Sequence, residues 1–456
     1  MSRLLEVLSV CLLISISSLA IPMLEPASKD ISATPQCSTN ASAAWVDVIL
    51  LIDTSINMGS SNLRKIATLV PLALSKFSIG NQADIMKGQH NTRVAVVTYD
   101  HIARVVANFT SINSINDLNG VLNRISVSSS SDANIYDAFM QYGNIFNETT
   151  DIQVQIDNNR PTAWVVFASS IKTPVINQYV TRIAPQNVGA GSPSSTVITI
   201  NFNTADAALT NTLNQLSLNP YANATMYNFA STSNTLTADL SWAILQANCF
   251  CQVEEGIPLV MFDKSNNRYS RYAQCMVLAG SGDPTEGIEN NVPQICANYD
   301  LTPASILSAD QENFVQNVWV SEEEDSAPYY IGLHKNSQSQ WVWYDYNLTD
   351  FSASYFNWAP GYPQNNGNCA VLNYANDGTT FVWQDADCEP QYTLNGLSLC
   401  QMRSCDAESV ACGFVEVIIL ASDQENTQRR PAHEKPSKRL HKISRANSNK
   451  RIVRKH

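Results

Sequence analysis

The sequence predicts a doubly wound α/β domain followed by a disulfide-bonded α+β domain. At 456 residues the chain is too long for one ordinary domain. Between residues 44 and 248, short apolar runs alternate with helical stretches, which is typical of a mainly parallel sheet covered on both faces. Between residues 251 and 405 the predicted strands are short, and tryptophan, tyrosine, asparagine and cysteine are frequent. That composition favours a small α+β domain held by disulfides.

The first 20 residues have the pattern of a cleaved secretory signal. Arg3 gives a basic start, residues 7–19 are apolar, and the small Ala20 ends the segment. A membrane anchor is the alternative, but a span needs roughly 20 apolar residues, and no later stretch reaches that length. We therefore expect a secreted, extracellular protein without a membrane span.

The elements of the first domain follow from its apolar periodicity. Strands are predicted at residues 46–53, 92–100, 103–110, 162–170, 194–203 and 224–231. Helices are predicted at residues 61–77, 115–125, 134–146, 173–183, 205–216 and 236–245. In such sheets, ligands bind at the carboxyl ends of the strands. The sequence DTSINMG, residues 53–59, follows the first strand and lies at that edge.

The run VDVILLIDTSINMG, a long helix and then TRVAVVTYD together resemble a von Willebrand factor type A domain. The resemblance implies a divalent cation, Ca²⁺ or Mg²⁺, at an Asp-x-Ser-x-Ser loop. It also implies a threonine ligand from a second loop and an aspartate after the fourth strand. Hard cations need several oxygen ligands, and an open position can take a carboxylate from a partner.

The first loop matches this ligand set in part. Asp53 and Ser55 stand at the expected places, and Asn57 replaces the second serine. The amide oxygen of Asn57 is a neutral ligand on a longer arm. In the simplest alternative, Asp53 only ends a strand and Ser55 caps the next helix.

The other two ligand positions are changed. The second loop, SSSSDANIYDAF, has no threonine, although Ser131 or Asp132 could substitute. After the fourth strand, residues 168–170 are Ala-Ser-Ser, so the expected carboxylate is missing. Because each carboxylate offsets part of the dehydration cost of the cation, we interpret DTSINMG as the remnant of a metal site.

The second domain resembles a C-type lectin domain. The segment CANYDLTPASILSADQENFV is similar to its first cysteine and second helix, and YYIGLHKN is similar to its Trp-Ile-Gly-Leu strand, with Tyr330 in place of tryptophan. The stretches WVWYDYN, YFNWAPGYPQNNGNCAVLN, WQDADC and LCQ match the following strands and the long loop in order. One helix, at residues 311–320, and several strand or loop segments are expected.

Ten cysteines remain after Cys11 leaves with the signal, as expected for disulfides in an oxidising compartment. The lectin resemblance implies pairing of Cys296 with Cys400 and of Cys369 with Cys388. It also suggests an additional bridge between Cys251 and Cys275, and leaves Cys405 and Cys412 to pair. Cys37 and Cys249 flank the first domain, and a bridge between them would join its ends, although the sequence leaves that pairing open.

The residues that bind calcium and sugar in many C-type lectin domains are altered here. The Glu-Pro-Asn type of triplet becomes Tyr362-Pro363-Gln364, and a tyrosine cannot replace a carboxylate ligand. The Trp-Asn-Asp triplet retains its acid as Asp385, preceded by Gln384. The resemblance implies a cis peptide bond before Pro363, which proline permits. We expect calcium-dependent sugar binding to be impaired, and the sequence identifies no metal cofactor with certainty. The five residues Tyr362, Pro363, Gln364, Gln384 and Asp385 form the candidate ligand-binding site.

Four aromatic residues near this loop could stack on a sugar: Tyr355, Trp358, Tyr362 and Trp383. The alternative role is packing beneath the loops, because aromatic side chains bury a large area. For Trp358 and Trp383 we favour packing. Tyr362 is the candidate for an exposed contact.

Charge and modification patterns point to the kind of partner. The formal charge of the chain is −12, but residues 421–456 carry +8, which leaves an acidic body of −20. An acidic body argues against a nucleic-acid partner. The basic tail lacks apolar periodicity, and we expect it to be disordered. Five tripeptides are candidate N-glycosylation sites, at Asn40, Asn108, Asn147, Asn223 and Asn347.

We expect a binding protein and not an enzyme. Only His90, His101 and His334 lie outside the tail, and the motifs of hydrolases, phosphate loops and dinucleotide sites are missing from the sequence. The leading hypothesis is a secreted recognition or adhesion protein that binds a glycan or an extracellular protein. The domain pairing is similar to that of nematode lectin-like proteins, which implies host defence. The alternatives are a matrix scaffold with degenerate metal sites and a secreted enzyme with an unfamiliar site.

Overall fold

The structure is a computed structural model that describes most of both domains. The described residues are 35–81, 90–145, 160–172, 195–219, 221–251, 256–280, 291–320, 328–378, 380–389 and 397–409. The expected signal segment, the helix expected at 173–183, Asn147, Cys412 and the basic tail lie outside these ranges. Among the described residues, no helix is both long enough and apolar enough to cross a membrane.

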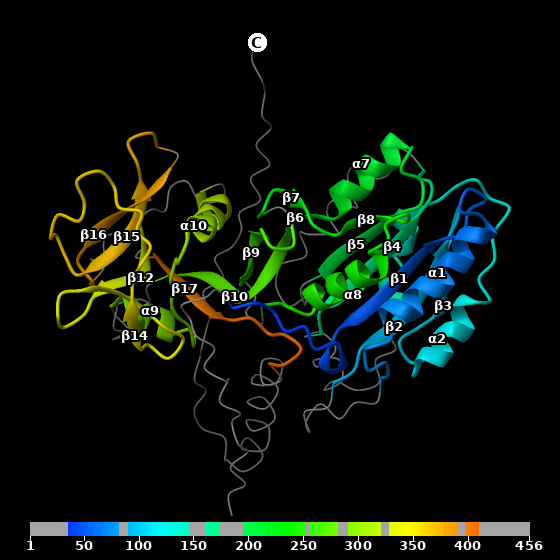
Figure 1. Ribbon diagram of the computed structural model, residues 1–456, viewed down its shortest axis with the longest axis horizontal. Helices are drawn as coiled ribbons and strands as arrows, with labels where there is room; N and C mark the ends of the chain where they lie inside the picture. Colours follow the sequence, from blue (N-terminus) through cyan, green and yellow to red (C-terminus); the bar gives the residue numbers. More distant parts are fainter. Residues whose placement is uncertain are drawn as a thin grey trace, which may run out of the picture. The chain divides into compact units, whose positions relative to one another are not determined.

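The first domain is built on a six-stranded sheet with strand order β3-β2-β1-β4-β5-β8 (Figure 1). Its strands are β1 (Asp47–Asp53), β2 (Arg93–Tyr99), β3 (Ala103–Ala107), β4 (Thr162–Ala168), β5 (Ser195–Asn201) and β8 (Asn228–Ala230). All neighbours pair in parallel except β2 and β3, which are antiparallel. A small separate ladder joins β6 (Leu218–Asn219) to β7 (Ala224–Thr225).

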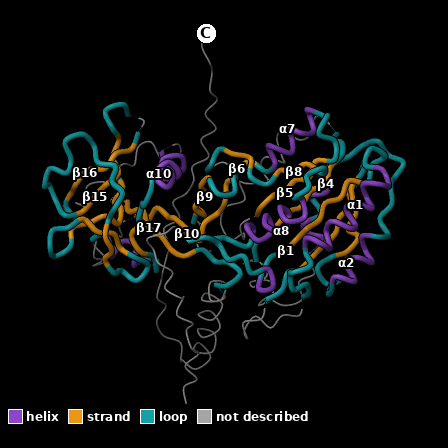
Figure 2. The backbone as a smooth tube through the Cα atoms, in the orientation of Figure 1, coloured by secondary structure: helices purple, strands orange, loops and turns teal. Residues whose placement is uncertain are grey.

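Helices cover both faces of this sheet (Figure 2). Side chains alternate along β1, so Val48 and Leu50 pack with one group of helices while Ile49 and Leu51 pack with the other. The first group is α1 (Gly59–Ala73), α2 (Ile115–Leu122) and α8 (Leu236–Ala247). The second is α3 (Ile135–Phe139), α4 (Tyr142–Ile145) and α7 (Ala207–Leu216). The predicted doubly wound class is confirmed.

The prediction of one continuous helix at residues 134–146 is wrong. The described part of this range, residues 134–145, contains the two short helices α3 and α4, because the chain turns at Met140 and Gln141. The C-cap N–H of Met140 donates to carbonyls of the preceding turn, which closes α3 after only five residues. A short 3₁₀ helix, Ala41–Ala43, precedes β1.

The second domain has a larger mixed sheet with the main order β14-β13-β12-β17-β10-β9, in which neighbours pair antiparallel except β12 and β17, which are parallel. Its strands are β9 (Ile257–Asp263), β10 (Arg268–Gly280), β11 (Thr302–Pro303), β12 (Tyr329–Lys335), β13 (Trp341–Tyr344), β14 (Asp350–Ser352), β15 (Cys369–Tyr374), β16 (Phe381–Ala386) and β17 (Leu397–Arg403). Helix α9 (Val292–Ala297) precedes α10 (Ala309–Val315), which continues into a π-helical turn, Gln316–Val320. The expectation of short strands fails for β10, which has 13 residues.

Four disulfides lie within the described residues. In the second domain they join Cys251 to Cys275, Cys296 to Cys400 and Cys369 to Cys388. The fourth joins Cys37 to Cys249, the residues that flank the first domain. Cys405 is also disulfide-bonded.

The segment before β1 is attached to the second domain. Gln36 forms an antiparallel bridge with Tyr272 of β10, and the N–H of Ala273 donates to the carbonyl of Pro35 at 2.7 Å. The N–H of Ser38 donates to the carboxylate of Asp406 at 2.9 Å. The first domain is therefore held to the second at its beginning as well as at its end.

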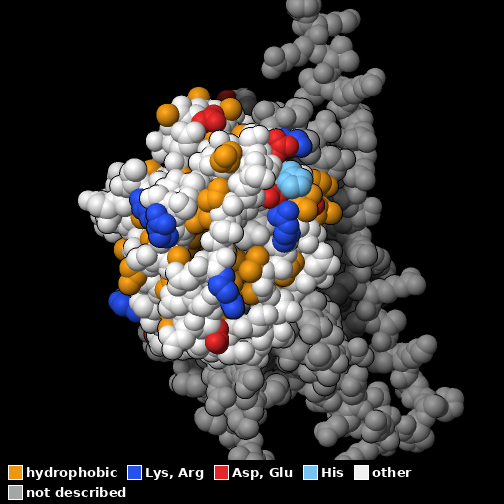
Figure 3. All heavy atoms as spheres, turned by 90° about the vertical axis from the view of Figure 1, so that its right-hand side faces the viewer, with side chains coloured by type: hydrophobic (Ala, Val, Ile, Leu, Met, Phe, Trp, Pro, Cys, Tyr) orange, Lys and Arg blue, Asp and Glu red, His pale blue; other side chains and the backbone are white. Residues whose placement is uncertain are grey.

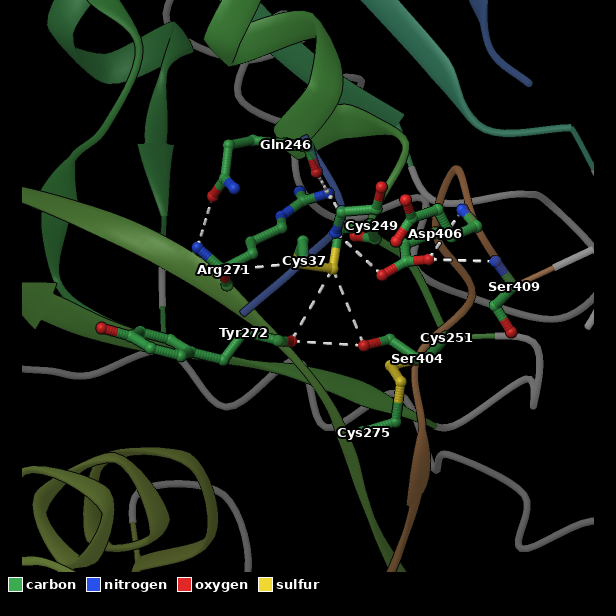
Figure 4. Close-up of a disulfide and its surroundings, with 12 residues drawn as sticks. Cys37, Gln246, Cys249, Cys251, Arg271, Tyr272, Cys275, Ser404, Asp406 and Ser409 are labelled. Atoms are coloured by element: carbon green, nitrogen blue, oxygen red, sulfur yellow. Dashed lines mark hydrogen bonds between the residues drawn. A yellow bond between two sulfur atoms is a disulfide. The ribbon is translucent and has the colours of Figure 1, made fainter. Parts of the chain in front are cut away.

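Arg271 of β10 and the Cys37–Cys249 disulfide complete this junction (Figure 4). The guanidinium of Arg271 donates to the carbonyls of Gln246 and Cys249 at 3.2 and 3.1 Å. These carbonyls lie at the C-terminal end of α8, where backbone groups lack partners within the helix and a cation is favourable. The Arg271 N–H also donates to the side-chain oxygen of Gln246.

Replacing Cys37 and Cys249 together by serine is expected to lower the free energy of unfolding by about 2–5 kcal/mol. The reason is that this bridge spans 212 residues, so its loss frees a long loop in the unfolded chain. Denaturant titration of the purified full-length protein measures the change. As a control, the Cys369→Ser/Cys388→Ser variant opens a bridge of only 19 residues and should lose less. A Cys37/Cys249 variant as stable as the wild type would contradict the assignment of a stabilising disulfide between these two residues.

Candidate functional site

The first candidate site lies where β1 ends, and Asp53 is fully buried there. One carboxylate oxygen accepts the N–H of Ser55 at 2.7 Å. The other accepts the N–H of Ser169 at 3.0 Å and its hydroxyl at 2.7 Å. The adjacent strands β1 and β4 place these groups side by side. Both oxygens of Asp53 therefore have donors from the protein itself.

The neighbouring polar side chains of this loop bond to one another. The hydroxyls of Ser55 and Ser170 lie 3.2 Å apart, and the side-chain N–H of Asn57 donates to the carbonyl of Ser131 at 3.1 Å. The expectation that Ser55 caps the next helix is wrong. Helix α1 begins one turn later, with Met58 as N-cap and no side-chain cap.

Lys172, from the segment after β4, contacts the second loop. The ammonium of Lys172 lies 3.0 Å from the carboxylate of Asp132, and its backbone N–H donates to the carbonyl of Ala133 at 3.1 Å. Asp132 is the acid that the sequence offered as a substitute ligand. Both charged groups are about half exposed, so the pair adds little stability, but it places a positive charge beside the loop.

These residues do not fit a divalent cation. Such an ion needs several oxygen ligands, preferably anionic, and the buried carboxylate of this loop, Asp53, is already engaged by three donors. In the part of the chain that the structure describes, no group of three or more His, Cys, Asp or Glu side chains is placed to hold a metal ion.

The second candidate site is the loop between β14 and β15, where the Tyr362–Pro363 peptide bond is cis. Asp385 of β16 lies beneath this loop and is 4% exposed. Its two oxygens accept the backbone N–H groups of Gln364 at 2.7 Å and Asn366 at 2.6 Å. Hydrogen bonds to an ionised acceptor are roughly twice as strong as neutral ones. Asp385 therefore fixes the loop.

Gly367 allows the loop to approach β16. A Cβ atom at this position would lie 1.9 Å from the carbonyl oxygen of Ala386, so no other residue fits without moving the backbone. The Gln384 side chain points elsewhere and accepts a hydrogen bond from Asn373 at 3.0 Å. Gln364, Asn365 and Asn366 are exposed. The loop thus presents carboxamides and no carboxylate, and it does not fit a calcium ion.

The aromatic residues near this loop divide into a buried and an exposed set. Trp383 is fully buried and donates its indole N–H to Glu312 of α10 at 2.9 Å. Tyr355 and Trp358 are half-buried against its ring. Tyr362, the aromatic residue expected to be exposed, is half-buried, whereas Phe356 is 41% exposed.

Sequence reasoning missed Glu312 and Phe356. Burial raises the pKa of Glu312 to about 7, although hydrogen bonds from Asn357, Trp383 and Gln316 oppose the shift. The sequence signal was weak, because an acid on an amphipathic helix is normally solvated. Only the packing of α10 against β16 shows that this one is buried.

The remaining predicted positions lie mostly on the surface. Asn40, Asn223 and Asn347 are exposed, and Asn108 is half-buried with its side chain bonded to Thr110. The face drawn in Figure 3 carries Lys and Arg side chains scattered among acidic and hydrophobic ones, not gathered in a single patch.

Comparison with protein families assigns both domains. Residues 47–241 match the model of the von Willebrand factor type A domain, and residues 290–400 match that of the lectin C-type domain. The chain therefore carries an N-terminal A-type domain and a C-terminal C-type lectin domain. Domains of these two classes are generally non-catalytic binding modules, and the pair fits an adhesion protein that binds carbohydrate or protein. No curated protein matches the chain.

Several solved structures are similar to parts of the chain. Proximal thread matrix protein 1 from the mussel byssus, with a zinc-occupied MIDAS motif, is 13% identical, with 45% of this chain and 47% of that chain covered and a TM-score of 0.35. This chain spans about half the length of the mussel structures it matches. The Ca²⁺-independent C-type lectin SPL-2 from Saxidomus purpuratus is 23% identical, with coverage of 28% and 86% and a TM-score of 0.22.

The Asp385→Asn substitution is expected to lower the free energy of unfolding by about 3 kcal/mol, because two hydrogen bonds lose their charged acceptor and an amide NH₂ can face a backbone N–H. Chemical denaturation measures the loss. The exposed Asp387, two residues further on, gives the control Asp387→Asn. Equal stability of the two variants would show that the loop does not depend on Asp385.

The raised pKa of Glu312 predicts that the stability of the protein falls as the pH rises. Its pKa in the folded protein lies above the ordinary 4.5, so the folded state holds a proton that the unfolded state has lost. The free energy of unfolding should therefore fall by up to about 3 kcal/mol between pH 4.5 and about 7, and level off above. Glu312→Gln should remove this component, whereas Glu408→Gln, at an exposed position, should keep it. If the free energy of unfolding depends on pH in the same way in both variants, Glu312 is not the source of this pH dependence.

Proposed function

We propose that this protein is an extracellular recognition or adhesion protein whose lectin-like domain binds its ligand, a glycan or a protein, without a metal ion. The observation that carries the proposal is the double hydrogen bond from the loop to Asp385. In a calcium-dependent site, carboxylates hold the ion and the ion orders the loop. Here the carboxylate orders the loop directly, so the binding surface is formed before any ion arrives.

The A-type domain supports the same interpretation. Asp53 accepts three hydrogen bonds from the protein, and Lys172 brings a positive charge to the second loop. A partner's carboxylate bridged by a cation is therefore not the expected mode of contact. We propose that this domain positions the lectin-like domain and contacts partners through its surface without an ion.

The finer assignments follow from the same sequence patterns. We propose that residues 1–20 direct secretion, that the exposed Asn40, Asn223 and Asn347 carry glycans, and that recognition serves host defence. Four disulfides suit an oxidising extracellular environment.

The test is retention of the full secreted chain on a printed array of glycans and on extracellular-matrix proteins, with EDTA or with millimolar Ca²⁺. We expect the same ligands to be retained in both conditions. The thermal midpoint should also be unchanged by Ca²⁺, since a bound ion would stabilise the folded state. Binding that disappears in EDTA and returns with Ca²⁺ would overturn the proposal.

A matrix scaffold is the second candidate function, and the junction favours it. Backbone bridges, Arg271 and the Cys37–Cys249 disulfide attach the two domains at both ends of the first. Such an attachment suits a protein that transmits load between partners. Selective retention on matrix proteins, with none on glycans, would favour this candidate.

A further inference from the structure

We propose that the aromatic row formed by Trp341, Trp358 and Phe356 is a glycan-binding platform that stacks on a pyranose ring. The inference rests on the proposed metal-independent recognition and names its ligand class and its residues. It places the contact beside the loop of Pro363 and not on the altered calcium ligands themselves.

The row is a continuous set of rings. The ring centroids of Trp341 and Trp358 lie 4.8 Å apart with their planes tilted by 57°. Those of Phe356 and Trp358 lie 6.3 Å apart with their planes only 15° from parallel. Trp358 is held from behind, because its ring meets the edge of the buried Trp383 at 6.0 Å and its backbone bridges to the same residue. The platform is therefore rigid before a ligand binds, which reduces the entropy lost on binding.

Phe356 distinguishes this row from core packing. Trp341 and Trp358 pack partly against the hydrophobic core, whereas Phe356 is 41% exposed and its ring is stacked with that of Trp358. The nearly parallel rings of Phe356 and Trp358 offer an apolar surface for the C–H face of a sugar.

The polar groups at the end of the row suit hydroxyls. The ammonium of Lys335 lies 5.1 Å from the centroid of the Trp341 ring and donates to the side-chain oxygen of Asn365 at 3.2 Å. Lys335 thus connects the row to the loop whose backbone Asp385 fixes. The exposed carboxamides of Gln364, Asn365 and Asn366 each carry both donors and acceptors.

This combination favours a sugar over an apolar peptide. A pyranose has C–H bonds of slightly positive charge on one face, which suit the negative face of an aromatic ring, and hydroxyls around its rim. Neutral carboxamides can satisfy such hydroxyls in either direction of donation. An apolar side chain of a peptide would cover the rings but would form no hydrogen bonds with those carboxamides.

The experiment compares variants of the full secreted chain on an array of pyranose oligosaccharides in EDTA, followed by titration with the best-retained oligosaccharide. Phe356→Ala should weaken binding roughly tenfold, as expected for a central aromatic contact. Asn365→Ala should weaken it by a smaller factor. The control is Tyr299→Ala, an aromatic residue of similar exposure, 43%, outside the row. Saturation-transfer NMR should show the sugar C–H protons in contact with the protein.

Thermal unfolding of each variant shows whether the fold is kept. If the wild type binds a glycan in EDTA and Phe356→Ala binds it equally well, the platform is wrong while the proposed function stands. If the wild type binds the glycan only with Ca²⁺ present, the proposed metal-independent function is wrong, and the proposal of the platform falls with it. If the wild type binds no glycan in either condition but retains an apolar peptide in a manner that Phe356→Ala abolishes, the row is a peptide site and the glycan assignment is overturned.

Discussion

The structure depends on the need to compensate carboxylates that are buried away from water. An isolated buried charge is costly, so it must find a cation or hydrogen-bond donors. Asp53 and Asp385, one in each domain, both find donors. In each case two or more N–H or O–H groups of a neighbouring loop point at the carboxylate. The loops at both candidate sites are thereby held in place by the protein alone.

This arrangement connects the altered ligand sets to function. In both domains, several residues that would ligate an ion have become neutral, and the remaining acid has become a structural acceptor. The surfaces above them keep their shape. In the lectin-like domain that surface carries carboxamides from the loop and the aromatic row, of which Phe356 is the most exposed member. The proposal of recognition without an ion rests on this geometry of the loop.

The junction limits how the two domains can act. The segment before β1 pairs with β10, and Arg271 of the same strand reaches the end of α8. The sequence showed cysteines on both sides of the first domain but not the β9–β10 hairpin that receives them. The sequence predicted only short strands in the second domain, and this hairpin, whose second strand has 13 residues, was therefore missed.

The sequence by itself indicated the six strands of the main sheet of the first domain, because apolar periodicity is a local property. It also indicated both domain classes through motifs of fixed spacing. It also showed which ion ligands were missing. Only the tertiary structure decided what replaced them. Two of the three donors to Asp53 belong to Ser169, 116 residues away, and the donors to Asp385 come from 19 and 21 residues away. The burial of Glu312 and the exposure of Phe356 depend equally on contacts between distant segments, which no local pattern encodes.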